Sequence, residues 1–141
     1  MARLAANGQP PFADTNVLLC LLSADTVKAD RAEALLGQRL TVSVQVLNEF
    51  ANIARRKLSM SWPEIVDVLA LVRQRCVVRS LTLGVHETAL VLVQRHAFAW
   101  YDALIVAAAA DAGCTTLFSE DMQNGLRVAR SLTIRNPFVA T

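Results

Sequence analysis

Short apolar runs alternate with longer segments whose apolar residues recur at helical spacing, and this alternation constrains the fold more than any other feature of the chain. The pattern is typical of an α/β domain in which helices cover a parallel sheet. The candidate strands are residues 11–13, 40–43, 77–80, 115–118 and 132–134. We therefore expect an α/β domain with a parallel sheet.

The segments between these strands are expected to be helices. One helix follows Asp14, and the others span about residues 26–36, 45–58, 62–75, 85–96 and 100–112. The run Ser61-Trp62-Pro63-Glu64 predicts a capping box with proline in the first turn. Gly37 and Gly113 are placed where glycine commonly ends a helix.

Length and composition indicate one domain. A chain of 141 residues with 54% hydrophobic residues can bury a substantial core. We expect a flexible leader over residues 1–10 and a single domain over 11–141. No uninterrupted apolar tract reaches the roughly 18 residues that a membrane span requires. Three widely spaced cysteines without a Cys-x-x-Cys motif suggest reduced core thiols in a cytoplasmic protein.

Four acidic residues lie where an acid is unexpected: Asp14, Glu49, Asp102 and Asp121. Asp14 follows the first candidate strand, and Asp102 is the only charge in residues 96–110. Charges seldom lie in apolar surroundings unless they are paired or bound to a metal. If the fold gathers these four, they require a cation.

The expected topology indicates which of the four acidic residues come together in the fold. Asp14 and Asp121 both follow strands, and the carboxyl ends of parallel strands share one edge of a sheet. Asp102 falls in the first turn of a helix, where the helix dipole favours a carboxylate. Glu49 is inside a helix, so it faces that edge only if the helix packs beside the first strand. Its polar stripe also contains Gln45, Asn52 and Arg56.

Electrostatics defines the chemistry of a gathered quartet. Two like unit charges about 4 Å apart cost roughly 4 kcal/mol at an effective dielectric constant near 20. Oxygen ligands suit Mg²⁺ and Mn²⁺, which can activate water and polarise a phosphodiester. Taken singly, each acid also has a structural interpretation, as a helix-start residue, a solvated helix residue or a turn residue. That interpretation leaves the apolar neighbourhood of Asp102 unexplained.

Four motifs carry a resemblance to a known family. They are FADTNVLL at residues 12–19, QVLNEF at 45–50, WYDALIVAAA at 100–109 and LFSEDMQNG at 117–125. In this order and spacing the chain resembles the PIN-domain ribonucleases and, within them, the VapC toxins of type II toxin–antitoxin systems. The resemblance runs from about residue 11 to residue 138.

The resemblance implies a doubly wound α/β/α domain with a central parallel sheet of four to five strands. It implies a Mg²⁺- or Mn²⁺-dependent endoribonuclease. The catalytic, metal-binding acids would be Asp14, Glu49, Asp102 and Asp121. Asn16 and Ser119 would orient carboxylates or waters, and Glu120 is a lower-ranked substitute for Asp121.

The resemblance also implies partners. These are an RNA substrate, a small antitoxin that blocks the acidic groove, and a second copy of the chain. Leu21 and Leu22 offer apolar surface for one or both protein contacts. Arg55, Arg56 and Arg127 are candidates for contacts with the RNA backbone, and single-stranded or looped RNA is the expected substrate. Neither histidine is expected to take part in catalysis.

Two alternatives stay open on the residues. The domain could be a non-catalytic RNA-binding or protein-interaction module on the same fold, which a missing acid would favour, but all four are present. A Mg²⁺-dependent phosphatase of the haloacid-dehalogenase type needs Asp-x-Asp after its first strand, whereas residues 14–16 are Asp-Thr-Asn. Phosphate-binding P-loop and dinucleotide-binding glycine motifs are absent from the sequence.

Overall fold

A six-stranded sheet forms the centre of the molecule in the computed structural model, which describes residues 9–128 and 131–139. Its order is β3-β2-β1-β4-β6-β5, and every pair is parallel except β5 with β6. The strands are β1 (Phe12–Ala13), β2 (Leu40–Ser43), β3 (Cys76–Arg79), β4 (Thr116–Phe118), β5 (Arg127–Val128) and β6 (Leu132–Arg135). The predicted α/β fold with a central, mostly parallel sheet is confirmed.

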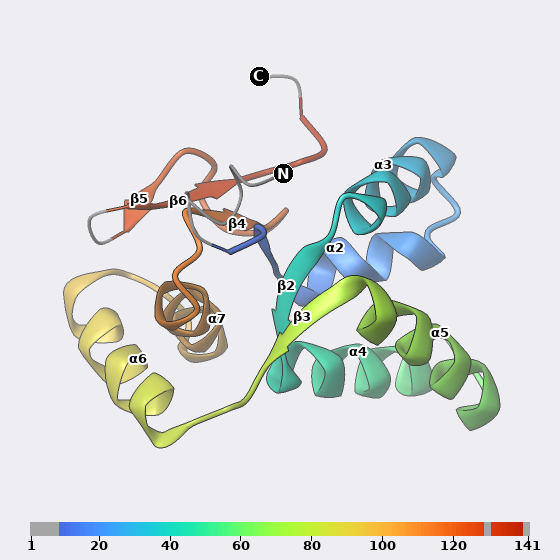
Figure 1. Cartoon of the computed structure of the whole chain (residues 1–141), viewed down its shortest axis with the longest axis horizontal. Helices are drawn as coiled ribbons and strands as arrows, with labels where there is room; N and C mark the ends of the chain where they lie inside the picture. Colours follow the sequence, from blue (N-terminus) through green and yellow to red (C-terminus); the bar gives the residue numbers. More distant parts are fainter. Residues whose placement is uncertain (1–8, 129–130, 140–141) are drawn as a thin grey trace.

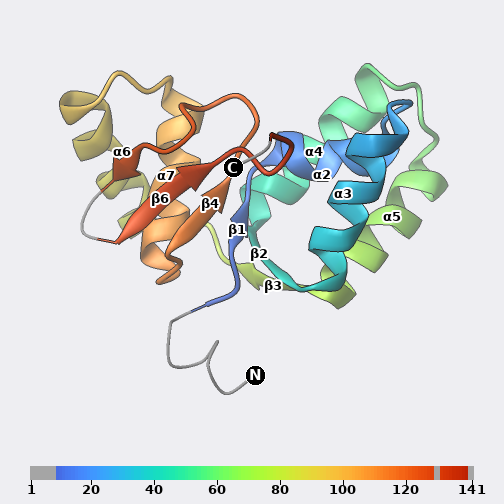
Figure 2. The ribbon, with the colours of Figure 1, turned by 90° about the horizontal axis from the view of Figure 1, so that it is seen from above.

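Helices cover both faces of this sheet. Helices α2 to α5 lie on one side, and α6 and α7 lie on the other (Figures 1 and 2). Their bounds are α2 (Thr15–Leu19), α3 (Thr26–Gly37), α4 (Val44–Arg56), α5 (Trp62–Arg75), α6 (Leu83–Arg95) and α7 (Trp100–Asp111), and a short 3₁₀ turn η1 (Cys20–Leu22) follows α2. The arrangement is the doubly wound, three-layer one implied by the resemblance.

Local signals in the sequence explain several helix boundaries. At the start of α5 the Ser61 hydroxyl accepts from the Glu64 amide (3.2 Å), and the Glu64 carboxylate accepts from the Ser61 amide (2.8 Å), as predicted. Helix α3 ends at Gly37, but the left-handed residue after it is Arg39 (φ 77°). Gly113, which follows α7, does adopt the left-handed conformation (φ 79°) that favours glycine.

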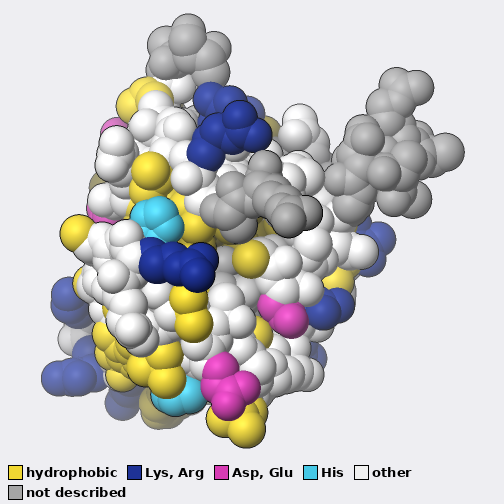
Figure 3. Space-filling view, turned by 90° about the vertical axis from the view of Figure 1, so that its left-hand side faces the viewer, with side chains coloured by type: hydrophobic (Ala, Val, Ile, Leu, Met, Phe, Trp, Pro, Cys, Tyr) yellow, Lys and Arg dark blue, Asp and Glu magenta, His cyan; other side chains and the backbone are white. Residues whose placement is uncertain are grey.

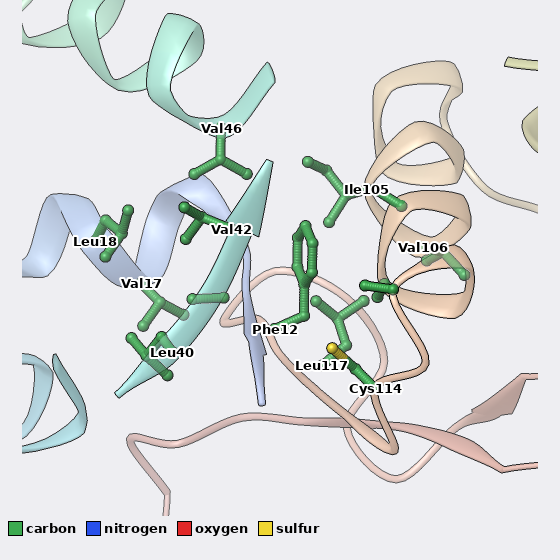
Figure 4. Packing of buried hydrophobic residues seen from close by; sticks show 14 of the residues in the cluster. Phe12, Val17, Leu18, Leu40, Val42, Val46, Ile105, Val106, Cys114 and Leu117 are labelled. Atoms are coloured by element: carbon green, nitrogen blue, oxygen red, sulfur yellow. The ribbon is translucent and has the colours of Figure 1, made fainter. Parts of the chain in front are cut away.

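The core fills both sides of the sheet. Strands β1 and β2 are wholly buried, as expected for central strands that helices cover on both faces. Figure 4 shows the Phe12 ring beside Ile105 and Leu117, while Val17 and Val46 pack on the other side of the sheet. Each fully buried side chain of this size stabilises the fold by about 1.5–3 kcal/mol. This packing fixes where the strand ends lie.

Strand β5 is the one strand that the sequence pattern does not predict. It has two residues and pairs antiparallel with β6 at the edge of the sheet. The loop between β4 and β5 is also hydrogen-bonded to β6: the Gly125 amide donates to the Ile134 carbonyl (2.7 Å), and the Ile134 amide donates to the Leu126 carbonyl (2.8 Å). The segment that carries Asp121 is therefore anchored at both ends, by β4 and by β6.

Most of the predicted leader lies outside the described residues, which begin at Gln9. The Pro10 carbonyl accepts a hydrogen bond from the Thr41 hydroxyl (2.7 Å), so the described part of the segment is bonded to the sheet. Within residues 9–128 and 131–139, none of the helices has the length and hydrophobicity needed to cross a bilayer.

The three cysteines are buried and free of disulfide bonds, as predicted. Burial raises the pKa of Cys76 to about 11 and raises the pKa values of Cys20 and Cys114 as well. The thiols therefore stay protonated at neutral pH and behave as small apolar core residues.

Candidate active site

The sheet order creates a crevice between β1 and β4. The chain moves outward from β1 to β2 and β3, and it then returns to the other side of β1 to form β4. In open α/β sheets, such a switch point is where ligands bind, at the carboxyl ends of the strands. Asp14 follows β1 and Ser119 follows β4, and the Asp14 amide donates to the Phe118 carbonyl (2.9 Å).

Asp14 is the most constrained acid of the site. Its side chain accepts hydrogen bonds from the Thr15 amide (2.7 Å), the Ser119 hydroxyl (2.9 Å) and the Asn16 amide group (3.2 Å). Only 6% of the residue is exposed. Burial raises the pKa of Asp14 from 3.8 to about 6, although the bonds from Ser119 and Thr15 lower it. The charges of Asp102 and Glu49 raise this pKa further.

Asn16 links the two sides of the crevice. Its amide nitrogen lies 3.2 Å from the nearest oxygen of both Asp14 and Asp121. Its side-chain oxygen accepts from the Glu120 amide (3.0 Å). The predicted contacts of Asn16 and Ser119 with the carboxylates are therefore present, and they hold the loop after β4 against the end of β1.

Glu49 reaches the same place from the middle of α4. The sequence left open whether this helix packs beside the first strand; in the structure α4 packs against α2, the helix that directly follows β1, and this contact brings Glu49 to the strand end. The Thr15 hydroxyl donates to Glu49 Oε1 at 2.6 Å. The sequence analysis did not single out Thr15; the only available signal was a hydroxyl directly after the first acid.

Asp102 completes the group from the first turn of α7. It is half-buried, and burial raises its pKa, with further contributions from the charges of Asp121 and Glu49. All four predicted acids line one cleft of about 360 Å³, which we call the acidic cleft. Its lining residues are Asp14, Thr15, Asn16, Leu19, Glu49, Asn52, Ile53, Asp102 and Asp121.

The donor set of the acidic cleft suits a hydrated divalent cation. No lysine or arginine is among the residues that line it in the described part of the chain, and the charges of neighbouring carboxylates raise the pKa values of Asp14 and Asp102. Among the described residues, no group of three or more histidine, cysteine, aspartate or glutamate side chains is close enough together to hold a metal ion as they stand. Mg²⁺ usually keeps several waters and takes only one or two carboxylates directly, so these oxygen donors fit it.

Glu120 and Asp121 point to different neighbours. The Glu120 carboxylate pairs with the Lys28 ammonium on α3, outside the acidic cleft. The Asp121 carboxylate accepts from Asn16 and lines the cleft. The geometry therefore favours Asp121 over Glu120 as the fourth acid of the cleft.

Arg55, one of the predicted RNA contacts, is engaged within the fold. Its guanidinium donates to the Met60 carbonyl (3.0 Å) and lies over the Trp62 ring, 5.5 Å from the centroid. These contacts hold the turn between α4 and α5. Arg127 is exposed on β5.

Arg56 is closer to the cleft. It lines a hollow of about 220 Å³, here called the basic hollow, with Lys57, Asn52 and Ile53. The last two residues also line the acidic cleft, so the hollow and the cleft adjoin. Positive charge thus begins at one end of the acidic cleft.

Comparison with known families agrees with this geometry. A family model described as PIN domain matches residues 12–128. The chain belongs to the PIN domain family. The family predicted from the four motifs is therefore confirmed.

Two solved structures resemble this PIN domain. VapC20 of Mycobacterium tuberculosis, a toxin that cleaves the sarcin–ricin loop, is 21% identical with a TM-score of 0.63, over 78% of this chain and 90% of that chain. A toxin–antitoxin complex from Klebsiella pneumoniae is 20% identical with a TM-score of 0.67, over 90% of this chain and 97% of that chain. At these identities the likeness concerns the fold. No curated protein sequence gives a match.

Proposed function

We propose that this PIN domain is a metal-dependent endoribonuclease and the toxin of a toxin–antitoxin pair. The observation that carries the proposal is the acidic cleft, where four carboxylates from separate parts of the chain meet at the switch point of the sheet. Family membership and the two toxin structures of the same fold support it.

Asp14, Glu49, Asp102 and Asp121 would hold Mg²⁺ or Mn²⁺, largely through water molecules. When bound, such a cation polarises a phosphodiester and lowers the pKa of a water. The chain's own part is to fix the carboxylates before RNA arrives. Three hydrogen bonds orient Asp14, Thr15 orients Glu49, and Asn16 orients Asp121. Acceptors fixed in advance need no reorganisation during the reaction.

RNA can bind at the acidic cleft only when a cation offsets the charge of its carboxylates. A phosphodiester carries a negative charge, and the acidic cleft without a cation repels it. The basic hollow at one end of the cleft supplies Arg56 and Lys57 for phosphates further along the chain. We infer single-stranded or looped RNA as the substrate class, because its backbone can bend into a site of this kind.

The antitoxin partner is part of the proposal. An apolar groove of about 500 Å³ shares no lining residue with the acidic cleft, and Leu21 and Leu22, the residues that the sequence offered for a protein contact, line it. Leu36, Val68 and Leu71 extend the apolar wall, and Glu33 and Arg75 add one charge of each sign. An apolar segment of an antitoxin that carries both charges fits this surface. The homodimer and the cytoplasmic location stay predictions.

The test is cleavage of a panel of structured RNAs by the purified protein in Mg²⁺, Mn²⁺ or EDTA. We expect cutting that needs metal and that is lost in Asp14→Asn and Asp102→Asn. Asp111→Asn is the matched control, because this exposed acid ends α7 and pairs with Arg79 instead of lining the cleft. A folded protein that neither cuts RNA nor binds Mn²⁺ in calorimetry would favour the non-catalytic module.

A further inference from the structure

We propose that a second hollow beside the acidic cleft is a nucleobase pocket, which receives an unpaired base next to the scissile phosphate. This inference rests on the proposed nuclease function and names a base-recognition site for it. The hollow has a volume of about 300 Å³. We call it the base pocket and define it by His96, Phe98, Met122, Gln123 and Leu126.

The base pocket and the acidic cleft share a wall. Asp102 and Asp121 line both of them. Bases project sideways from the phosphodiester backbone, so a phosphate held at these acids brings the base of an adjoining nucleotide to the pocket. The position of the pocket follows from the same loop that carries Asp121, which β4 and β6 anchor.

The walls have the chemistry that a base requires. The His96 and Phe98 rings are half-buried, and their centroids lie 5.5 Å apart at an interplanar angle of 49°. Unpaired bases stack on aromatic side chains of this kind. Met122 is buried and Leu126 is half-buried, so they add apolar surface to the lining of the pocket.

Polar groups stand where the edge of a base would lie. The Gln123 side chain is exposed at the pocket and carries both a donor and an acceptor. The Asp102 and Asp121 carboxylates can accept hydrogen bonds from exocyclic amino groups. A purely apolar peptide or lipid chain would meet these two carboxylates without a partner for them, so the mixed lining favours a base.

The same face of the molecule is open to solvent. Figure 3 shows the side of the molecule where α6 and α7 lie, with apolar (yellow), histidine (cyan), basic (dark blue) and acidic (magenta) side chains exposed on it. The acidic cleft adjoins the base pocket through Asp102 and Asp121, and it adjoins the basic hollow through Asn52 and Ile53. One strand of RNA can therefore contact the base pocket, the acids and Arg56 in succession.

The test distinguishes a Phe98 ring that stacks on an RNA base from one that only packs within the protein. Short fluorescent homopolymeric RNAs of each base are titrated by anisotropy, in Mg²⁺, with the protein carrying Asp14→Asn to prevent cleavage. Phe98→Leu, which keeps an apolar side chain, should weaken binding about tenfold, the loss expected for one stacked base. Phe98→Trp should bind as tightly as the parent. Arg56→Ala is the contrast, because it should reduce the salt dependence of binding whereas Phe98→Leu should not.

A second measurement does not depend on affinity. RNA containing 4-thiouridine is photocrosslinked in Mg²⁺ to the protein carrying Asp14→Asn, which leaves the RNA intact, and the modified peptides are identified by mass spectrometry. We expect crosslinks in residues 96–98 or 122–126. Crosslinks only elsewhere, or a Phe98→Leu variant that binds like its parent, would overturn the base pocket while cleavage by the wild-type protein leaves the nuclease function intact. Absence of both cleavage and RNA binding would remove the two proposals together.

Discussion

Thr15 contacts two of the four acids at once: its backbone amide donates to Asp14 (2.7 Å), and its hydroxyl donates to Glu49 (2.6 Å). The side-chain bond joins the first residue of α2 to a residue of α4 that lies 34 positions later in the chain. Thr15 is itself buried, with 5% of its surface exposed. The relative position of Asp14 and Glu49 therefore depends on a residue that carries no charge.

Removing the Thr15 hydroxyl should slow RNA cleavage. Thr15→Val keeps the shape of the side chain but leaves Glu49 without its donor, and partners that orient metal ligands typically contribute about 10–100-fold to activity or metal affinity. Thr15→Ser restores the donor and should recover most of the rate. Initial cleavage rates at several Mg²⁺ concentrations measure both effects. Equal rates for the valine and serine variants would show that this bond does not orient Glu49 for the reaction.

The metal-free protein should lose stability as the pH rises. The folded pKa of Asp14 is raised from 3.8 to about 6, so the folded state binds the proton more tightly than the unfolded state does. The protonated Asp14 carboxyl contributes on the order of 3 kcal/mol to the free energy of unfolding. This contribution is fully present below pH 3.8 and is lost as the pH rises through about 6.

Thermal denaturation in EDTA between about pH 4 and about pH 8 measures this fall. Asp14→Asn is the control, and its stability should fall less over the same range. Mg²⁺ should reduce the fall in the wild-type protein, because a cation favours the ionised carboxylate. Parallel curves for the wild type and Asp14→Asn would mean that Asp14 is not the responsible group.

Neighbouring acids in the loop after β4 should differ in their effect. Asp121→Asn removes a cleft carboxylate and should lower cleavage at least tenfold, whereas Glu120→Gln removes a partner of Lys28 outside the cleft and should change the rate less than threefold. Single-turnover cleavage rates of both variants decide the comparison. The reverse order of effects would assign the fourth acid to Glu120.

Substitutions of the two adjacent arginines Arg55 and Arg56 should have different effects, one on folding stability and the other on RNA binding. Arg55→Ala loses the bond to Met60 and the contact with Trp62, which together should cost about 1 kcal/mol of folding stability. Arg56→Ala should leave folding stability nearly unchanged and weaken RNA binding with a smaller salt dependence. Urea denaturation and RNA titration at several salt concentrations test the pair. A salt dependence that changes in Arg55→Ala instead would reassign the phosphate contact.

The apolar groove should determine antitoxin binding. Leu71 lines the groove and is 47% exposed, so Leu71→Arg should disrupt docking without unfolding the protein. Val66→Arg is the control, because Val66 is 63% exposed on the same helix but does not line the groove. Co-purification with the proposed antitoxin measures binding. Retained binding by Leu71→Arg, at the level of Val66→Arg, would place the antitoxin on another surface.

Much of the fold could be predicted because its signals are local. The apolar runs specify strands such as β2, and the Ser61–Glu64 pattern specifies the start of α5. The meeting of Asp14 with Ser119 follows from one rule, since parallel strands present their carboxyl ends at one edge. The sequence motifs therefore located the acidic cleft well.

Features that depend on tertiary packing could not be predicted in this way. The Thr15–Glu49 bond requires α4 to lie against α2, and no residue pattern within either helix predicts that the two helices pack together. Strand β5 has only two residues, too few for a period, and exists because it pairs with β6. His96 looks like a residue that ends a helix, and its place beside Asp102 and Asp121 emerges only when α6 and α7 pack together.

The hydrogen bond from Ser119 to Asp14 joins residues 105 positions apart, and this separation has a consequence for synthesis. A ribosome that is still making the chain has released Asp14 and Glu49 long before Asp121 exists. Any growing chain that stops short of β4 lacks both the hydroxyl that holds Asp14 and the fourth carboxylate. A nuclease built this way acquires its complete site only after β4 and the loop that follows it have been made, so we expect a chain that stops before β4 to be inactive toward RNA.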